Sequence, residues 1–249
     1  MQILIATLLG MAVGHTVDLG FPRLYTDEPF RGPFYRCGTC RARFRGIYTV
    51  PVLGFVVRRG RCPDCGSKLP LRALALPLGA ATLFACSMLV FEDFGLGLLG
   101  GVFATVFLML AVADIERRLL PNRIIYPSLL VAIGMSWAWP DASVTEILAG
   151  GLAATGIGIA MKAVSLPFGA EAFGMGDIKT MILMGFVVGL PAVLVGIFIG
   201  MIAAAVFGGL LVLLRLRSRR DYIPHGPFLA LGAVVALFWG IDIWGAYTG

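Results

Sequence analysis

Long apolar stretches separated by short polar segments are the feature of this sequence that most restricts its fold. Hydrophobic residues make up 59% of the 249 residues and charged residues only 14%, with a mean hydropathy of +0.91. A helix of about 20 apolar residues crosses a hydrocarbon core of ~30 Å, so each stretch is a candidate membrane span. We expect about eight spans, of which the fourth and sixth are short: 1–19, 71–91, 95–113, 124–139, 144–164, 178–190, 192–214 and 228–247. The sequence therefore predicts an all-α polytopic membrane protein.

The distribution of basic residues gives these spans an orientation. If the N-terminus lies outside, all 20 lysines and arginines fall on one side of the membrane, while Glu92, Asp93 and Asp141 fall on the other. By the positive-inside rule, the basic side is the cytoplasm. The net charge of +6 is thus explained by topology, and nucleic acid is not expected as a partner. The first stretch lacks a basic start and an Ala-x-Ala site, which favours a span over a cleaved signal peptide.

The polar segment between the first two spans contains two cysteine pairs. Cys37 and Cys40 form one Cys-x-x-Cys pair, and Cys62 and Cys65 form the other, 21 residues further on. Four thiolates with this spacing can bind a tetrahedral Zn²⁺ and leave no open position for catalysis. Two disulfides are the alternative, but they require an oxidising compartment, and the basic flanks place this segment in the cytoplasm. We therefore expect a structural zinc, and three domains: a first transmembrane helix (1–19), a cytoplasmic cysteine domain (20–70) and a membrane domain of about seven helices (71–249).

Two aspartates stand at the ends of predicted spans, on the cytoplasmic side: Asp114 in the motif Asp-x5-Leu-Pro-Asn, and Asp177 in Gly-x-Gly-Asp. Each alone could cap a helix at the membrane surface. A carboxylate beside lipid is costly, however, so two of them on one face indicate a functional pair. One ionised carboxylate can take a proton from water while the other, protonated, polarises a peptide carbonyl. The pair predicts an intramembrane aspartic protease.

Several other residues could contribute either to the site or only to packing and anchoring of the helices. Lys179 and either Arg117 or Arg118 could bias the charge of the aspartate pair, or could anchor helices at the interface. His15 and His225 are expected to pack or to form hydrogen bonds rather than to bind a ligand. Glycine pairs at 100–101, 150–151 and 208–209 are expected to let helices approach closely in lipid.

Together these residues resemble the bacterial type IV prepilin peptidases. The similarity covers nearly the whole chain and extends to the segments 51–53, 59–62 and 224–230. The resemblance implies an aspartic endopeptidase of the bacterial inner membrane, in which the outside N-terminus expected from the basic residues would be periplasmic. It implies that the basic leaders of type IV prepilins and type II secretion pseudopilins are cut at the cytoplasmic face, with Asp114 and Asp177 as the catalytic pair. It also identifies the four cysteines with the zinc-type motif of the family.

The resemblance further implies that the new N-terminus is methylated with S-adenosylmethionine, as in many members. Two segments depart from the family pattern. Residues 73–77 read Ala-Leu-Ala-Leu-Pro where the family usually has Tyr-Pro-Leu-Val-Glu, and residues 14–18 replace an asparagine-containing run. Methyl transfer is therefore expected on the resemblance alone.

Other classes of protein share parts of this pattern. Presenilin-like proteases share Gly-x-Gly-Asp but lack the cysteine segment, which also separates the chain from archaeal preflagellin peptidases. A metal-binding membrane scaffold or transporter could use the aspartates as ion ligands. That class would place the carboxylates near the middle of the bilayer, whereas here they stand at the ends of spans.

Overall fold

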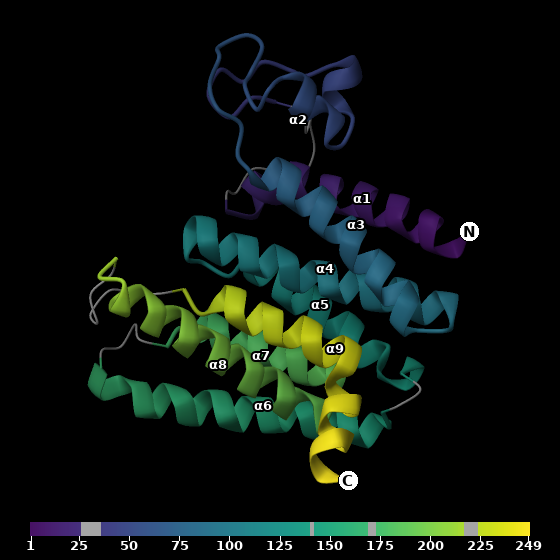
Figure 1. Ribbon diagram of the computed structural model, residues 1–249, viewed down its shortest axis with the longest axis vertical. Helices are drawn as coiled ribbons and strands as arrows, with labels where there is room; N and C mark the ends of the chain where they lie inside the picture. Colours follow the sequence, from purple (N-terminus) through teal and green to yellow (C-terminus); the bar gives the residue numbers. More distant parts are fainter. Residues whose placement is uncertain (26–35, 140–141, 169–172, 217–223) are drawn as a thin grey trace. The chain divides into compact units, whose positions relative to one another are not determined.

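The described part of the chain is helical (Figure 1). The computed structural model describes residues 1–25, 36–139, 142–168, 173–216 and 224–249. Within them there is no strand beyond two isolated bridges in the cysteine segment. Six helical segments are long and apolar enough to cross a membrane: Gln2–Tyr25, which contains α1 (Gln2–Gly20), then α3 (Arg72–Val90), α4 (Phe94–Arg117), α6 (Val144–Ser165), α8 (Ala192–Leu213) and α9 (Gly226–Thr248). The prediction of an all-α polytopic membrane protein is confirmed.

The fourth and sixth predicted spans form shorter helices. Helix α5 (Asn122–Gly134) has 13 residues and is followed by a short turn, η3 (Ser136–Ala138). Helix α7 (Met175–Val188) has 14 residues. A helix of that length extends only about 21 Å, less than a hydrocarbon core of about 30 Å. The count of eight spans therefore stays a prediction.

The chain divides into two compact units, Met1–Thr105 and Val106–Gly249, with the division inside α4. In the first unit α1 packs against α3, and Gly10 is needed there because a Cβ atom would lie 2.7 Å from the Ala80 carbonyl oxygen. The segment between these helices carries the four cysteines and the short helices η1 (Phe21–Tyr25), η2 (Gly46–Thr49) and α2 (Leu53–Val57). The predicted domain boundaries at 19 and 70 stay a prediction.

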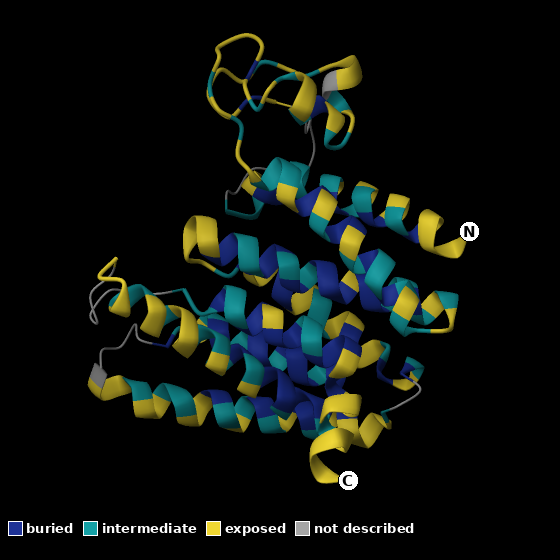
Figure 2. Ribbon diagram, in the orientation of Figure 1, coloured by how far each residue is buried: buried dark blue, intermediate teal, exposed yellow. Residues whose placement is uncertain are grey.

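Helix α7 forms the core of the second unit. It packs against α5, α6, α8 and α9, and Met181, Leu183 and Met184 on it are completely buried. Buried residues gather around it in Figure 2. A helix that is apolar on most sides must be covered by other helices or by lipid. Its surroundings explain why a helix too short for a typical span still reads as strongly apolar.

Helices α6 and α7 run antiparallel, and contacts at both ends fix their register. At one end the Leu190 N–H donates to the Glu146 carbonyl oxygen, at 3.0 Å. At the other end the Lys162 ammonium donates to the Phe173 carbonyl oxygen. Helix α7 and its flanking residues thus cover the same length as the stretch of α6 from Glu146 to Lys162.

Candidate active site and metal centre

Asp114 lies near the end of α4 with only 3% of its surface exposed. Its Oδ2 accepts a hydrogen bond from the backbone N–H of Gly226, at 2.9 Å. Gly226 is the first residue of α9, so the carboxylate receives both the hydrogen bond and the positive end of the helix dipole. The absence of a side chain at Gly226 permits this approach, because a Cβ atom there would lie 2.6 Å from Asp114 Oδ2.

Asp177 lies in the first turn of α7 and is 4% exposed. Its Oδ2 accepts a hydrogen bond from the backbone N–H of Gly174, at 3.0 Å, which satisfies one of the free donors at the start of the helix. The cap expected for a lone aspartate is therefore present. It accounts for one oxygen of Asp177 and leaves the other available for chemistry.

The structure brings the two aspartates together within the second unit. The carboxylates of Asp114 and Asp177 are close enough to interact electrostatically. Two buried carboxyl groups that repel each other favour a pair that holds one proton in common. Such a pair contains both a general base and a general acid.

The remaining residues of the two aspartate motifs explain how this juxtaposition is built. Leu120 of the first motif packs on Gly176 of the second, where a Cβ atom would lie 2.9 Å from Leu120 Cδ1. Asn122 Oδ1 accepts a hydrogen bond from Lys179 Nζ, at 2.8 Å. Motifs that lie far apart in the sequence therefore contact each other directly beside the aspartates.

Basic side chains around the pair are only partly those expected from the sequence. The sequence suggested that either Arg117 or Arg118 could bias the charge of the pair, and Arg118 interacts electrostatically with Asp114. Lys179 instead donates to Asn122 and lies 5.3 Å above the ring centre of Tyr126. Lys162 on α6 and His225 before α9 are the further basic groups that interact with Asp177. Sequence reasoning assigned no site role to either, although a lysine inside an apolar span was a usable signal for Lys162.

The four cysteine sulfurs form a compact cluster. All four Sγ atoms lie within 4.8 Å of one another. Cys37 and Cys65 are 3.8 Å apart, as are Cys40 and Cys62. Four thiolates about 2.3 Å from a tetrahedral zinc would be about 3.8 Å apart, whereas a disulfide requires about 2.05 Å. The cluster could hold a metal ion, and the two-disulfide alternative is not the state of these thiols.

The two cysteine pairs have the same backbone geometry. The N–H of Cys37 donates to the Ala42 carbonyl, and the N–H of Cys62 donates to that of Ser67, both at 2.9 Å. Hydrogen bonds from the Ser67 side chain and backbone lower the pKa of the Cys65 thiol. Burial disfavours the thiolate of Cys37, but hydrogen bonds led by that from Ser67 outweigh it and lower the pKa of Cys37 to about 6. These hydrogen bonds favour the thiolates of Cys37 and Cys65, the form of the side chain that binds a metal. For Cys40, the hydrogen bond from the backbone of Ala42 is outweighed by burial and by hydrogen bonds from the other three cysteines, which together raise the pKa of its thiol.

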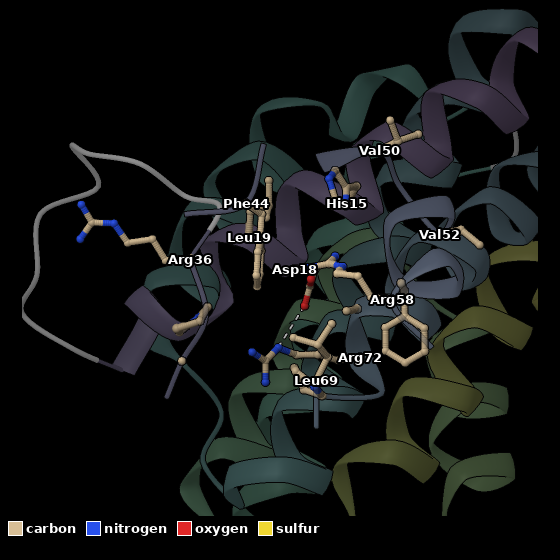
Figure 3. A pocket seen from close by; sticks show the side chains of 15 residues that line it. His15, Asp18, Leu19, Arg36, Phe44, Val50, Val52, Arg58, Leu69 and Arg72 are labelled. Carbon is tan, nitrogen blue, oxygen red and sulfur yellow. Dashed lines mark ion pairs between the residues drawn. The ribbon is translucent and has the colours of Figure 1, made fainter. Parts of the chain in front are cut away.

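A separate cavity of about 160 Å³ lies in the first unit (Figure 3). An ion pair between Asp18 and Arg72, with 3.1 Å between Oδ1 and Nε, stands at its wall. His15 Nε2 lies 3.0 Å from the Thr49 carbonyl oxygen, so the packing and hydrogen-bonding role predicted for this residue is confirmed. Arg58 also lines the cavity.

Two models of known protein families match this chain, and their matched regions fall in both units. Residues 101–209 match the Type IV leader peptidase family, and residues 8–91 match the Bacterial Peptidase A24 N-terminal domain. No solved structure matches. The chain is 28% identical over 214 residues to a prepilin leader peptidase/N-methyltransferase of Bacillus subtilis, covering 85% of this chain and 84% of the relative. It is 29% identical over 220 residues to a protein of the same name from Pseudomonas putida, covering 85% and 74%.

The first matched region contains both aspartates and the second contains all four cysteines. The motifs, the helical membrane fold and these matches agree over most of the chain. The chain therefore belongs to the bacterial type IV prepilin peptidase family.

Proposed function

We propose that this protein is a membrane aspartic endopeptidase that removes the leader of type IV prepilins or pseudopilins, with Asp114 and Asp177 as its catalytic pair. The observation that carries the proposal is the juxtaposition of two buried carboxyl groups from separate helices, each held by one backbone N–H. The names of the relatives supply the substrate class.

The chemistry follows from the sharing of one proton by the pair. The ionised carboxylate takes a proton from water as the water oxygen bonds to the scissile carbonyl carbon. The protonated carboxyl donates to the carbonyl oxygen and so stabilises the charge that develops there. When the C–N bond breaks, a proton passes from the pair to the leaving nitrogen, and the pair is again singly protonated.

The proposed membrane topology has the N-terminus in the periplasm and the aspartates at the cytoplasmic face. The basic residues support this orientation by the positive-inside rule. Hydrogen bonds near the aspartates join α4 to the start of α9, and α6 to the residue before Gly174. These helix ends therefore share one level, which requires α5 and α7 to cross between levels and supports eight spans over six.

Cleavage of a model prepilin in membranes tests the proposal. Asp114→Asn and Asp177→Asn keep the size of each side chain and remove its titrating carboxyl. We expect each variant to lose cleavage by about 10²–10⁴-fold, the usual contribution of a general acid or base. Asp242→Asn is the matched control, because Asp242 is exposed on α9. Normal cleavage by both variants would contradict the proposal and favour a metal-binding scaffold or transporter.

Methyl transfer is a second candidate activity, favoured by the names of the relatives. The cavity in the first unit carries charges that could meet the amino-acid group of S-adenosylmethionine, but Asp18 and Arg72 already pair with each other. Its volume of about 160 Å³ is also below the roughly 300–1,000 Å³ of typical ligand pockets. The cavity does not fit the whole cofactor, so we assign its residues no step.

A direct assay separates methylation from cleavage. Pre-cleaved pilin and labelled S-adenosylmethionine are incubated with wild type and with Asp177→Asn. Label on the new N-terminus with both proteins supports a methyl-transfer site independent of the aspartates. No label with wild type means that the activity is absent.

A further inference from the structure

Each aspartate is held by a peptide group whose preceding residue is aromatic. Phe173 precedes Gly174, whose N–H donates to Asp177, and His225 precedes Gly226, whose N–H donates to Asp114. The rings of Phe173 and His225 meet edge to face, with their centres 6.0 Å apart and their planes at 73°. The two peptide groups that hold the aspartates are therefore linked through one ring contact.

Lys162 acts on the same peptide group that holds Asp177. Its ammonium donates to the Phe173 carbonyl oxygen, and the N–H of that peptide group belongs to Gly174. A charged donor on the carbonyl polarises the peptide and strengthens its N–H as a donor. The Lys162 ammonium is thus connected to the Asp177 carboxylate through the single peptide group between Phe173 and Gly174.

His225 supplies the second charge. It interacts electrostatically with both Asp114 and Asp177, and its Nδ1 is buried without a hydrogen-bond partner among the described residues. Among the described residues, the other charged groups that interact with the pair are Arg118, which directly follows α4, and Lys162 on α6. Of these side-chain types, only histidine changes its charge near neutral pH.

We propose that Lys162, Phe173 and His225 form a cationic support that sets the position and charge of the aspartate pair. The inference rests on the proposed peptidase function. Lys162 fixes the peptide that holds Asp177, Phe173 joins that peptide to the one that holds Asp114, and His225 adds a positive charge that stabilises the singly ionised pair. All three are positioning residues that act through the aspartates.

The test is the pH profile of kcat/KM for cleavage of a model prepilin by purified protein. His225→Phe keeps an aromatic ring against Phe173 and removes the charge. We expect the acid limb of its profile to move to higher pH by about one unit, because a nearby cation favours the ionised pair by at least this much. Phe173→Leu keeps the charge and removes the ring contact, so kcat should fall while the acid limb stays in place.

Two variants of Lys162 test its part in the support, and one variant of His15 is the control for His225. Lys162→Met should lower kcat by about tenfold or more, and Lys162→Arg, which retains charge and donor, should recover most of that loss. His15→Phe changes the other histidine, in the first unit, and should leave the acid limb where it is in wild type.

The outcomes separate this inference from the proposed function. An unshifted acid limb in His225→Phe, or equal cleavage by wild type and Lys162→Met, overturns the cationic support while the peptidase stands. A uniform loss at every pH in His225→Phe, with normal thermal unfolding, also overturns it, since this indicates a packing role alone. If wild type does not cut the prepilin, the proposed function itself fails.

Discussion

A single glycine at the start of α9 controls how closely a backbone donor can approach Asp114. A Cβ atom at Gly226 would lie 2.6 Å from Asp114 Oδ2 and 2.8 Å from its Cγ, so neither group could keep its place. The motif residues around the aspartates have similar tasks, as Leu120 on Gly176 illustrates. The site therefore depends on the absence of side chains at Gly226 and Gly176 as well as on the two carboxyl groups.

We predict that Gly226→Ala reduces prepilin cleavage by about 100-fold, because a misplacement of about 1 Å in a catalytic group has effects of that size. Gly245→Ala on the same helix is the matched control, since a Cβ atom there has nothing within 4 Å. Initial cleavage rates, together with thermal unfolding of both variants, provide the measurement. Full activity of Gly226→Ala would show that the close approach does not set the position of Asp114.

At the scale of elements, the contact between α6 and α7 carries the site. A Cβ atom at Gly185 would lie 2.7 Å from the Gly150 carbonyl carbon and 2.9 Å from Gly151 Cα. Backbone atoms cannot move aside as a flexible side chain can, so the two helices would have to separate. Lys162 and Asp177 belong to these two helices, and stability and activity are therefore coupled here.

Gly185→Ala should destabilise the protein by about 1–3 kcal/mol, the usual cost of overpacking. It should also reduce cleavage, because α6 and α7 position Lys162 and Asp177. Gly156→Ala, on α6 but with open space around its Cβ position, should leave both properties unchanged. Thermal unfolding in detergent and cleavage rates decide between these outcomes, and an unchanged Gly185→Ala would exclude tight packing at this contact.

The cysteine segment is an element too small to be stable through burial alone, so a metal ion is expected to hold it. We predict one zinc per chain in wild type and none in Cys62→Ser, with greater susceptibility of the segment to proteolysis. Cys86→Ser is the control, because Cys86 lies in α3 outside the cluster. Metal analysis and limited proteolysis measure both effects. Retention of zinc by Cys62→Ser would mean that this sulfur is not a ligand.

For the whole molecule, the number of membrane crossings depends on whether the short helices α5 and α7 cross. Within the described residues six helices have the length and composition of a span, but the shared level of Asp114 and Asp177 favours eight crossings that include α5 and α7. The two alternatives differ in where the segment between α5 and α6 lies. With eight crossings it is periplasmic, and with six it stays in the cytoplasm.

A reporter enzyme that is active only in the periplasm, fused after Ser143, should therefore be active. The same reporter fused after Arg117 should be inactive in both alternatives and serves as the control. Activity of each fusion in intact cells, corrected for its amount, gives the measurement. An inactive Ser143 fusion would mean that α5 does not cross.

Properties that depend on local composition and spacing could be predicted from the amino-acid sequence. Apolar runs predicted the helices, the spacing of Cys37, Cys40, Cys62 and Cys65 predicted a cluster, and charge at the ends of spans singled out Asp114 and Asp177. These signals are readable because helix length, ligand spacing and the cost of charge in lipid are properties of short segments.

The groups that surround the aspartates could not be predicted in this way, because they come from helices that meet only in the folded protein. The Gly226 N–H that binds Asp114 lies 112 positions away in sequence, and the lysine near Asp177 is Lys162 rather than Lys179. The glycine pairs also differ: Gly150 and Gly151 pack against α7 and its C-terminal end, while Gly209 has nothing within 4 Å of its Cβ position. Contacts of this kind depend on the register between helices, which is set by the packing of whole faces and is not encoded in any single segment.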